Sequence, residues 1–414
     1  MNASQERWSL PAEQRQALGA GLIALVLFGA AWLVLHWGFY THDQIIDTPV
    51  YQRYGDAMLD GQVPYADFRV EYPPVALPVF VLPAIGDRHD EATYRRNFER
   101  LMVVCGLLAV AGTALALGAL YASPERLFAA LGFVVLAPLA LGSVILTRFD
   151  LWPTALLVLG LAAVLAERRR IGLGVLGLAA AAKIFPAVVV PPALIYIWRR
   201  YGRTEGIACA IVFALVVAAC FIPFLWVSPG GVWDSLSRQA DRPLQIESLG
   251  SSFLLVAHQL GAWTVHLNLS HGSQNQGGSF ADAIAAIQSV LQAAALIGLW
   301  IVFARGAATP ERLVRYSAAC VAAFIALGKV LSPQFLIWLL PLVPLVRGRR
   351  GIAASALLAL VLVLTQLWFP YRYWRLALHQ DAIASGLVLA RDLVLLGLVA
   401  VLVMPRREPA RSGP

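Results

Sequence analysis

The sequence has little charge, and this shortage excludes a soluble globular protein. Aspartate, glutamate, lysine and arginine make up 14% of the 414 residues, whereas a typical soluble domain has about 25%. Hydrophobic residues make up 59% of the chain. Most of the chain must therefore face lipid or other apolar helices, and we expect a polytopic membrane protein.

The sequence also lacks the motifs of the common metal, disulfide and nucleotide sites. All four cysteines lie in apolar segments and no two form a CxxC pair, so we expect them to act as small hydrophobic residues. There is no HExxH motif, no phosphate-binding P-loop and no nucleophile elbow. We therefore expect neither a metal nor a cofactor.

The net charge of +8 is carried by short arginine clusters between hydrophobic runs, including Arg168 to Arg170, Arg199 to Arg203, and Arg347 to Arg350. Cytoplasmic loops of membrane proteins carry such clusters. The pattern indicates that the protein is surrounded by membrane lipids and that its positive charge does not serve to bind nucleic acid. It also predicts that both termini lie in the cytoplasm.

The hydrophobic runs predict an all-α fold with about 12 membrane-entering helices in a single domain, residues 1–414. The run at 171–198 has arginine clusters at both ends, and a helix of this length is about 42 Å long, too short for two spans. We therefore predict a hairpin of two short helices that breaks at Lys183 to Pro186. No strand-like alternation is visible. The other spans are expected near residues 17–38, 98–120, 127–146, 151–166, 206–228, 284–304, 314–331, 335–346, 351–369 and 383–404.

This topology places the polar segments on the outer face, in large external loops at about 39–97, 229–283 and 370–382. The first apolar stretch has no small-residue cleavage site after it, so we expect it to be retained as a helix. Arginine-rich, alanine-rich and glycine-rich usage is compatible with a bacterial plasma membrane.

Asp47, in the first external loop, is the first candidate for chemistry. A carboxylate at a membrane-to-loop junction can act as a general base toward a hydroxyl group. The same residue precedes Thr48 and Pro49, which is typical of a helix N-cap. The two roles are compatible, and Asp43 and Glu71 are the alternative bases.

Lysine is rare, since Lys183 and Lys329 are the only lysines among 32 basic residues. Both lie in apolar segments, where an ionisable group indicates a functional site, and an ammonium group suits a phosphate. Each could instead extend along the apolar surface and cap a helix end. Arg148 is a third candidate phosphate ligand, with Asp150 as a substrate ligand, although the two could simply form an internal ion pair.

In the second external loop, the side chains of Arg238, Arg242 and Glu247 offer two cations and a carboxylate to a substrate that arrives from outside. These residues could equally form a solvated charge cluster. The complete set of predicted substrate-binding residues, besides the phosphate ligands, is Tyr51, Tyr72, Asp150, Arg238, Arg242, Glu247 and Gln334.

The stretch "DTPVYQRYGDAMLDGQVPYADFRVEYPPVALPVFVLP" resembles the first external loop of glycosyltransferase family 87, in the GT-C superfamily of membrane glycosyltransferases. Further similar segments are "TRFDLWPTAL", "GLAAAAKIFPAVVVPP", "RPLQIESLGSS" and "GKVLSPQFLIWLLPL". The family includes polyprenyl-phosphate-mannose-dependent α-1,2-mannosyltransferases. The resemblance implies transfer of a sugar, with inversion, from a lipid-linked phosphosugar to a glycolipid or cell-wall glycan acceptor on the outer face, without a metal.

In this family the catalytic base is an acidic residue of the first external loop, and the resemblance places it at Asp47, with Asp43 nearby. A transporter or flippase of polyprenyl-linked sugars is the main alternative, since buried lysine and aspartate could also bind a substrate in transit. The large outer loops and small inner loops favour the enzyme.

Overall fold

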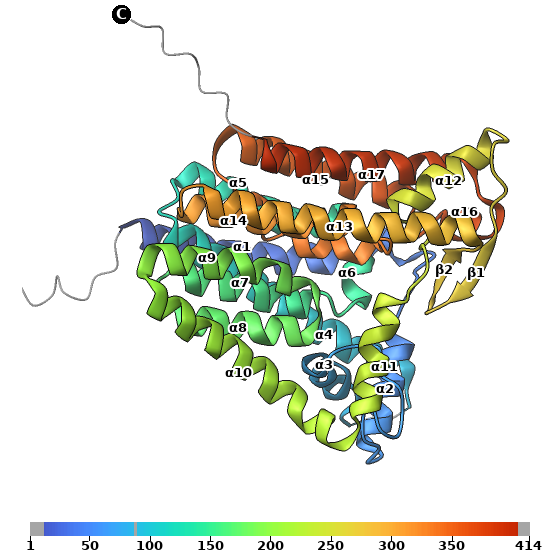
Figure 1. Cartoon of the computed structure of the whole chain (residues 1–414), viewed down its shortest axis with the longest axis horizontal. Coiled ribbons are helices and arrows are strands. Elements are labelled where there is room, and N and C mark those ends of the chain that lie inside the picture. The colour runs from blue at the N-terminus through green and yellow to red at the C-terminus, as the bar shows by residue number, and fades with distance from the viewer. Residues whose placement is uncertain (1–11, 87–88, 405–414) are drawn as a thin grey trace, which may run out of the picture.

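The structure is a computed structural model that describes residues 12–86 and 89–404, and nearly all of its regular elements are helices (Figure 1). This confirms the all-α expectation. The first half contains α1 (Ala12–Val34), η2 (Gly38–Thr41), α2 (Thr48–Leu59), η3 (Pro74–Ala76), α3 (Leu77–Val81), η4 (Leu82–Ala84), α4 (Glu91–Ala119), α5 (Pro124–Leu141), α6 (Val144–Thr147), α7 (Leu151–Leu165), α8 (Arg169–Ala182), η5 (Phe185–Val189) and α9 (Val190–Tyr201).

The second half begins with a long helix and contains a small hairpin of strands. Its elements are α10 (Arg203–Val227), α11 (Pro229–Ala240), α12 (Leu249–Gln259), β1 (Leu267–Ser270), β2 (Ser273–Gln276), α13 (Ser279–Arg305), α14 (Pro310–Ala326), η6 (Pro333–Leu339), η7 (Val343–Leu345), α15 (Gly348–Trp368), α16 (Tyr373–His379) and α17 (Ala382–Val403).

Within the described ranges, seven helices are long and apolar enough to cross a membrane: α1, α4, α5, α10, α13, α15 and α17. This confirms a multi-pass membrane protein. Every span that the sequence predicts has a helical counterpart, but several are short, such as α7 and the 3-10 segments η6 and η7. The count of about 12 membrane-entering helices stays a prediction.

Small residues let these helices approach closely where hydrophobic burial gives little driving force. A Cβ on Gly160 of α7 would lie 3.0 Å from the carbonyl oxygen of Gly172 in α8. A Cβ on Gly112 of α4 would lie 2.8 Å from a methyl group of Val158. The glycines therefore allow α4, α7 and α8 to form one tightly packed group.

The predicted hairpin at 171–198 is present. Helix α8 ends at Ala182, Lys183 is extended with φ −159° and ψ 145°, and α9 follows the short η5 segment. Pro186 cannot continue a helix from the preceding turn, which explains the break. The break places Lys183 in the interior of the protein, where irregular backbone must face protein or a cavity.

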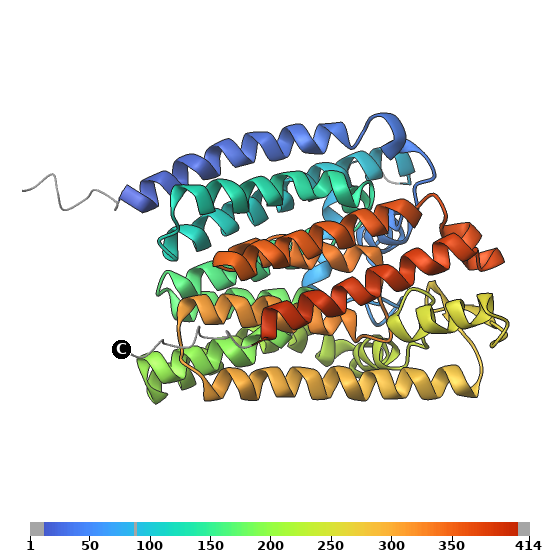
Figure 2. The same cartoon turned by 90° about the horizontal axis from the view of Figure 1, so that it is seen from above.

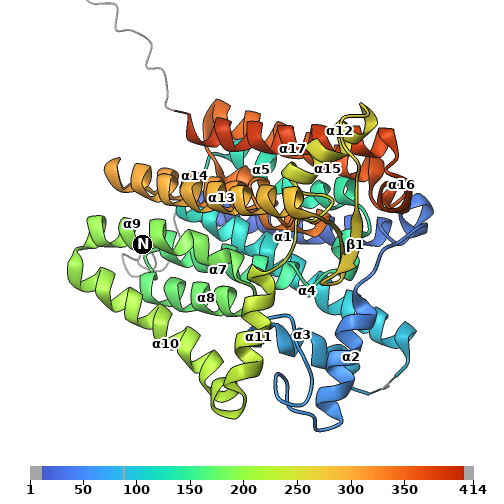
Figure 3. The ribbon, with the colours of Figure 1, turned by 45° about the vertical axis from the view of Figure 1, so that its right-hand side comes forward.

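The elements of the predicted external loops gather at one end of the long helices (Figures 1 and 2). Helices α2, α3 and α11 lie together there, next to the β-hairpin, as Figure 3 also shows. The arginine clusters lie at helix ends that contact one another: Arg170 pairs with Glu205 at 2.8 Å, and Arg199 donates to the carbonyl of Ala304 at 2.6 Å. The side of the membrane that each end faces stays a prediction.

The described residues also contain one short pair of strands, which the sequence did not indicate. Strands β1 and β2 form an antiparallel hairpin that pairs Leu267 with Gln276 and Ser270 with Ser273. Four-residue strands in a polar run give too few alternations to be seen in a sequence, and the pairing itself is made by backbone groups.

Candidate active site

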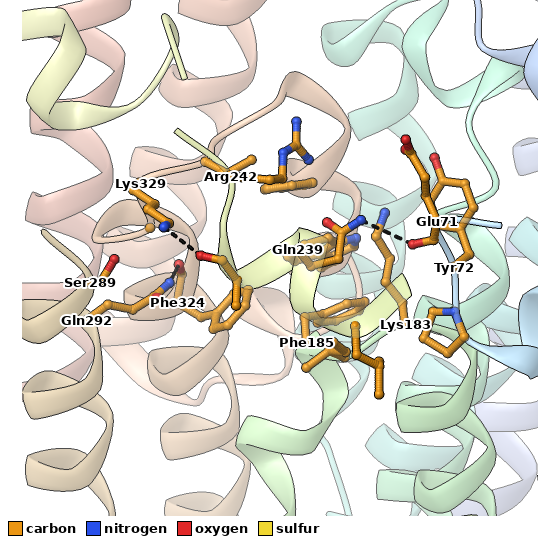
Figure 4. Close-up of a pocket in the computed structure, with 18 of the residues that line it drawn as sticks. Glu71, Tyr72, Lys183, Phe185, Gln239, Arg242, Ser289, Gln292, Phe324 and Lys329 are labelled. Carbon is orange, nitrogen blue, oxygen red and sulfur yellow. Dashed lines mark hydrogen bonds between the residues drawn. The ribbon is translucent and has the colours of Figure 1, made fainter. Parts of the chain in front are cut away.

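A cavity of about 460 Å³ lies between the break after α8, residues 71–73 of the first loop, and helices α11, α13 and α14 (Figure 4). Its walls carry six of the residues singled out in the sequence, and a larger number of apolar and aromatic side chains. The six residues are Glu71, Tyr72, Lys183, Arg242, Lys329 and Gln334. Residues that are far apart in the chain therefore meet in one place.

Lys183 lies at one end of this cavity and is held there by Asp150. Its Nζ is 2.7 Å from Asp150 Oδ1, which also accepts a hydrogen bond from Trp338 Nε1 at 2.6 Å. Nζ also lies 4.7 Å from the ring centre of Phe149. The ammonium therefore has one charged partner and an aromatic surround, while the side chain stays 14% exposed toward the cavity.

Lys329 and Arg242 line the other part of the cavity (Figure 4). Lys329 Nζ donates to the carbonyl oxygen of Ala240 at the end of α11, at 2.7 Å, so this lysine does cap a helix end as the alternative interpretation supposed. Arg242 donates to Ser273 Oγ at 3.0 Å, and burial lowers the pKa of its guanidinium from the usual value. Both groups still border the cavity.

Glu71 and Tyr72 close the cavity from the side of the first loop. The backbone there is held by Tyr65, whose hydroxyl donates to the Tyr72 carbonyl at 2.6 Å, and by Gln239, whose amide donates to the Glu71 carbonyl at 3.1 Å. Burial raises the pKa of the Tyr72 hydroxyl, and the neighbouring Glu71 raises it further. Tyr72 therefore stays a neutral hydrogen-bonding group.

Asp47 occupies the N-cap position of α2, but its side chain makes no capping hydrogen bond. Asp47 Oδ2 forms an ion pair with Arg148, and the Tyr51 hydroxyl approaches the same oxygen at 3.4 Å. Among the described residues, no group hydrogen-bonds Oδ1. The side chain is 31% exposed, so this carboxylate is both oriented and accessible.

Arg148 and Asp150 do not pair with each other, which corrects the alternative interpretation of the sequence. Arg148 pairs with Asp47 and donates to the carbonyl of Ile45 at 3.2 Å, whereas Asp150 pairs with Lys183. Residues 148–150, between α6 and α7, are not helical. The side chains of Arg148 and Asp150 therefore point toward different partners. Arg148 does not line the cavity that holds the two lysines.

An aromatic cluster separates the Asp47–Arg148 pair from Lys183. The ring of Tyr51 stacks 4.7 Å from Phe80, and Tyr72 meets Phe149 edge-on at 4.8 Å. Phe149 in turn faces Lys183. Tyr51 is fully buried in this cluster, so it supports the wall of the cavity from behind and does not line it.

The other predicted residues lie outside the cavity. Asp43 is exposed, with a left-handed φ of 51°. Arg238 lies on α11 near Tyr54. Glu247 is 2% exposed, and burial raises the pKa of its carboxyl group to about 8, although Arg391 and Arg148 oppose that rise.

Sequence reasoning missed several groups around this site. Phe185 stacks on Trp338 at 3.8 Å, and both line the cavity beside Lys183. Ser289 and Gln292 of α13 line the other end. Polar residues at this spacing in an apolar helix were a usable signal, but aromatic residues in apolar helices gave none. The described residues contain no group of three histidine, cysteine or acidic side chains placed to hold a metal ion.

Three comparisons with known proteins bear on the family of this chain. Among solved structures, ArnT from Cupriavidus metallidurans, crystallised with undecaprenyl phosphate, is similar at 16% identity and a TM-score of 0.49, over 91% of this chain and 76% of that one. A search of curated proteins finds no match. The sequence model described as glycosyltransferase family 87 matches residues 71–333, well over half of the chain. The protein therefore belongs to glycosyltransferase family 87.

Proposed function

We propose that this membrane glycosyltransferase transfers mannose from a polyprenyl-phosphate donor to a hydroxyl group of a glycolipid or cell-wall glycan, with inversion at the anomeric carbon. The observation that carries the proposal is the meeting of three cations, Lys183, Arg242 and Lys329, around one apolar cavity. A phosphate joined to a long lipid needs cations to bind the phosphate and an apolar surface to bind the lipid.

The cations supply the electrostatic part of the reaction. A polyprenyl phosphate is a good leaving group, so no general acid is required. As the sugar–phosphate bond breaks, negative charge develops on the phosphate, and cations fixed beforehand stabilise that charge at little cost of reorganisation. Lys183 is fixed by Asp150, and Lys329 by the carbonyl of Ala240.

Helix α13 offers a path for the lipid tail. Ser289 and Gln292 face the cavity, while Ile287, Val290 and Leu291 of the same helix are exposed. Few residues of α13 are buried by the rest of the protein, and the helix lies on the outside of the bundle (Figures 1 and 2). The tail would therefore leave the cavity along α13 into the surrounding lipid.

Asp47 is the proposed general base. Its carboxylate takes the proton of the acceptor hydroxyl while that oxygen bonds to the anomeric carbon, and the phosphate leaves with the electron pair of the broken bond. Arg148 and Tyr51 hold Oδ2, which leaves Oδ1 for the acceptor. Neither Asp47 nor Asp43 lines the cavity that holds the cations, whereas Glu71 does. Glu71 is therefore the first alternative base, and the exposed Asp43 is the second.

The test is a transfer assay with purified protein in nanodiscs, labelled polyprenyl-phospho-mannose and a glycolipid acceptor fraction. Wild type is compared with Asp47→Asn, Glu71→Gln and the control Asp43→Asn. We expect Asp47→Asn to lower the turnover number by about 100-fold or more, as loss of a general base does. Asp43→Asn should stay close to wild type, and thermal melting checks that each variant is folded.

Other outcomes redirect the proposal. If Asp47→Asn transfers at the wild-type rate and Glu71→Gln does not, Glu71 is the base. Glucosyl and arabinofuranosyl donors run in parallel decide whether mannose is the sugar. If wild type transfers none of them, the donor class is wrong, and an assay for flipping of the same lipids tests the transporter alternative.

A further inference from the structure

Two charged residues in the last membrane helix have no place in the reaction described above. Arg391 and Asp392 lie inside the apolar helix α17, and both are 0% exposed. Charges at such positions are expensive to bury and usually serve a function. Arg391 Nε lies 2.8 Å from Asp392 Oδ1, and its guanidinium carbon lies 5.7 Å from the ring centre of Trp368 in α15.

Arg391 also reaches out of its helix to the second loop. Its Nη2 donates to the backbone carbonyl of Glu247 at 2.6 Å. Glu247 belongs to the segment 242–248, between α11 and α12, which we name the cavity strap because its first residue, Arg242, lines the cavity. The buried guanidinium thus ties a membrane helix to the backbone of this strap.

The rest of the cavity strap is bonded to the neighbourhood of Lys329. The backbone N–H of Gln245 donates to the carbonyl of Lys329 itself, at 2.9 Å. Strand β2 holds the strap from the other side: the N–H of Ile246 donates to Gln274 at 3.0 Å, and the N–H of Gln276 donates to Leu244 at 2.8 Å. Movement of the strap would therefore change the positions of both Arg242 and Lys329.

We propose that Arg391 is a positioning residue that fixes the cavity strap, so that Arg242 and Lys329 stand together to receive the phosphate of a lipid-linked substrate. Cations fixed before binding lose less freedom when a ligand arrives. The role in phosphate binding rests on the proposed function, whereas the anchoring of the strap rests on the contacts alone. Arg391 itself does not touch the cavity.

The variant that tests the proposal is the double substitution Arg391→Met/Asp392→Leu. Removing both charges together avoids a buried unpaired charge, and apolar replacement of a buried pair is often tolerated. Arg126→Met is the matched control, because Arg126 also donates to a backbone carbonyl, that of Leu345, but lies outside the cavity and the strap. Arg391→Lys tests whether a single donor to the Glu247 carbonyl is sufficient.

Two measurements are made on each protein. Hydrogen–deuterium exchange reports the amides of Gln245 and Ile246, and titration with undecaprenyl phosphate, followed by tryptophan fluorescence, reports phosphate-lipid affinity. We expect the double variant to exchange faster across 244–248 and to bind the lipid about 10-fold more weakly or worse, since small displacements of binding groups are costly. Arg126→Met should match wild type in both, and Arg391→Lys should recover part of the affinity.

The outcomes separate this inference from the proposed function. If the double variant is folded and exchanges like wild type across 244–248, the anchoring role is overturned, whatever the enzyme does. If exchange rises but lipid affinity is unchanged, the positioning role is overturned. If wild type binds no undecaprenyl phosphate, the proposed donor class fails and the positioning role with it, while faster exchange would still establish the anchor.

Discussion

At the scale of single residues, the site depends on which partner each charged side chain finds. Asp47 has the sequence position of a helix cap, yet its carboxylate pairs with Arg148. Arg148 is 101 positions further along the chain, after α4 and α5. Lys183 pairs with Asp150. Local sequence offers the residue types, but a long-range contact decides the partner.

Glu247 gives a prediction about stability and pH. Its pKa is about 8 in the folded protein and about 4.3 in an unfolded chain. Between these values the folded state holds a proton that the unfolded state has lost, so stability falls as the pH rises from about 4.3 to about 8. The Gln side chain of Glu247→Gln stays neutral at every pH. The stability of this variant should therefore fall less than that of wild type over the same pH range.

The measurement is the melting temperature in detergent at pH 5, 6, 7 and 8. We expect the wild-type value to fall more steeply across this range than that of Glu247→Gln. The exposed Glu91, changed to Gln, is the control and should follow wild type. A Glu247→Gln curve parallel to wild type would mean that Glu247 is already ionised in the fold at pH 5.

At the scale of elements, α11 joins the two large loops. Ser228, its N-cap, donates to the carbonyl of Tyr65 in the first loop at 2.9 Å. Gly231, in the first turn, lies so close to that same carbonyl that a Cβ would collide with it. This contact holds α11 and the cavity-lining Gln239 against the first loop.

Gly231→Ala should therefore push α11 away from the first loop, lowering both the melting temperature and the rate of transfer. The neighbouring Gly230 is a matched control, because a Cβ there meets nothing within 4 Å. Gly230→Ala should be neutral or slightly stabilising, as alanine favours helix over glycine. The loss is expected to be about 1–3 kcal/mol, the usual cost of overpacking. Equal melting temperatures for the two variants would contradict this packing.

At the scale of the whole molecule, the loops that carry the site lie at one end of the bundle, and arginine clusters lie at helix ends away from them (Figure 1). The positive-inside rule predicts that the arginine end lies in the cytoplasm. The proposed outer-face chemistry depends on that orientation.

Cysteine labelling in intact cells tests the orientation. Three of the four native cysteines are buried and the fourth is half-buried, so new exposed cysteines can be distinguished. Gln62→Cys and Leu269→Cys, at exposed positions of the two large loops predicted to be external, should react with a membrane-impermeant maleimide. Arg349→Cys should react only after the cells are opened. Labelling of Gln62→Cys and Leu269→Cys from opposite sides would contradict the arrangement itself, and labelling of Arg349→Cys alone would invert the orientation.

The sequence alone was sufficient to predict the class of the protein. Long apolar runs leave a chain no stable alternative to membrane helices, and the proline after Lys183 allows no continuous helix there. The motifs that resemble glycosyltransferase family 87 are local strings, so they could be read without any structure. The match of the family model over residues 71–333 confirmed the family, although it begins after Asp47. The two lysines stood out because charge is rare in apolar segments.

Only the tertiary structure decided how these residues combine. Lys183 and Lys329 are 146 positions apart, and their shared cavity exists because the break after α8 faces the end of α14. Arg242 reaches the same cavity from a strap whose Glu247 carbonyl accepts a hydrogen bond from Arg391, near the other end of the chain. Contacts of this kind are set by packing and by backbone hydrogen bonds between distant segments. Neither produces a periodic pattern in the sequence from which the contact could be predicted.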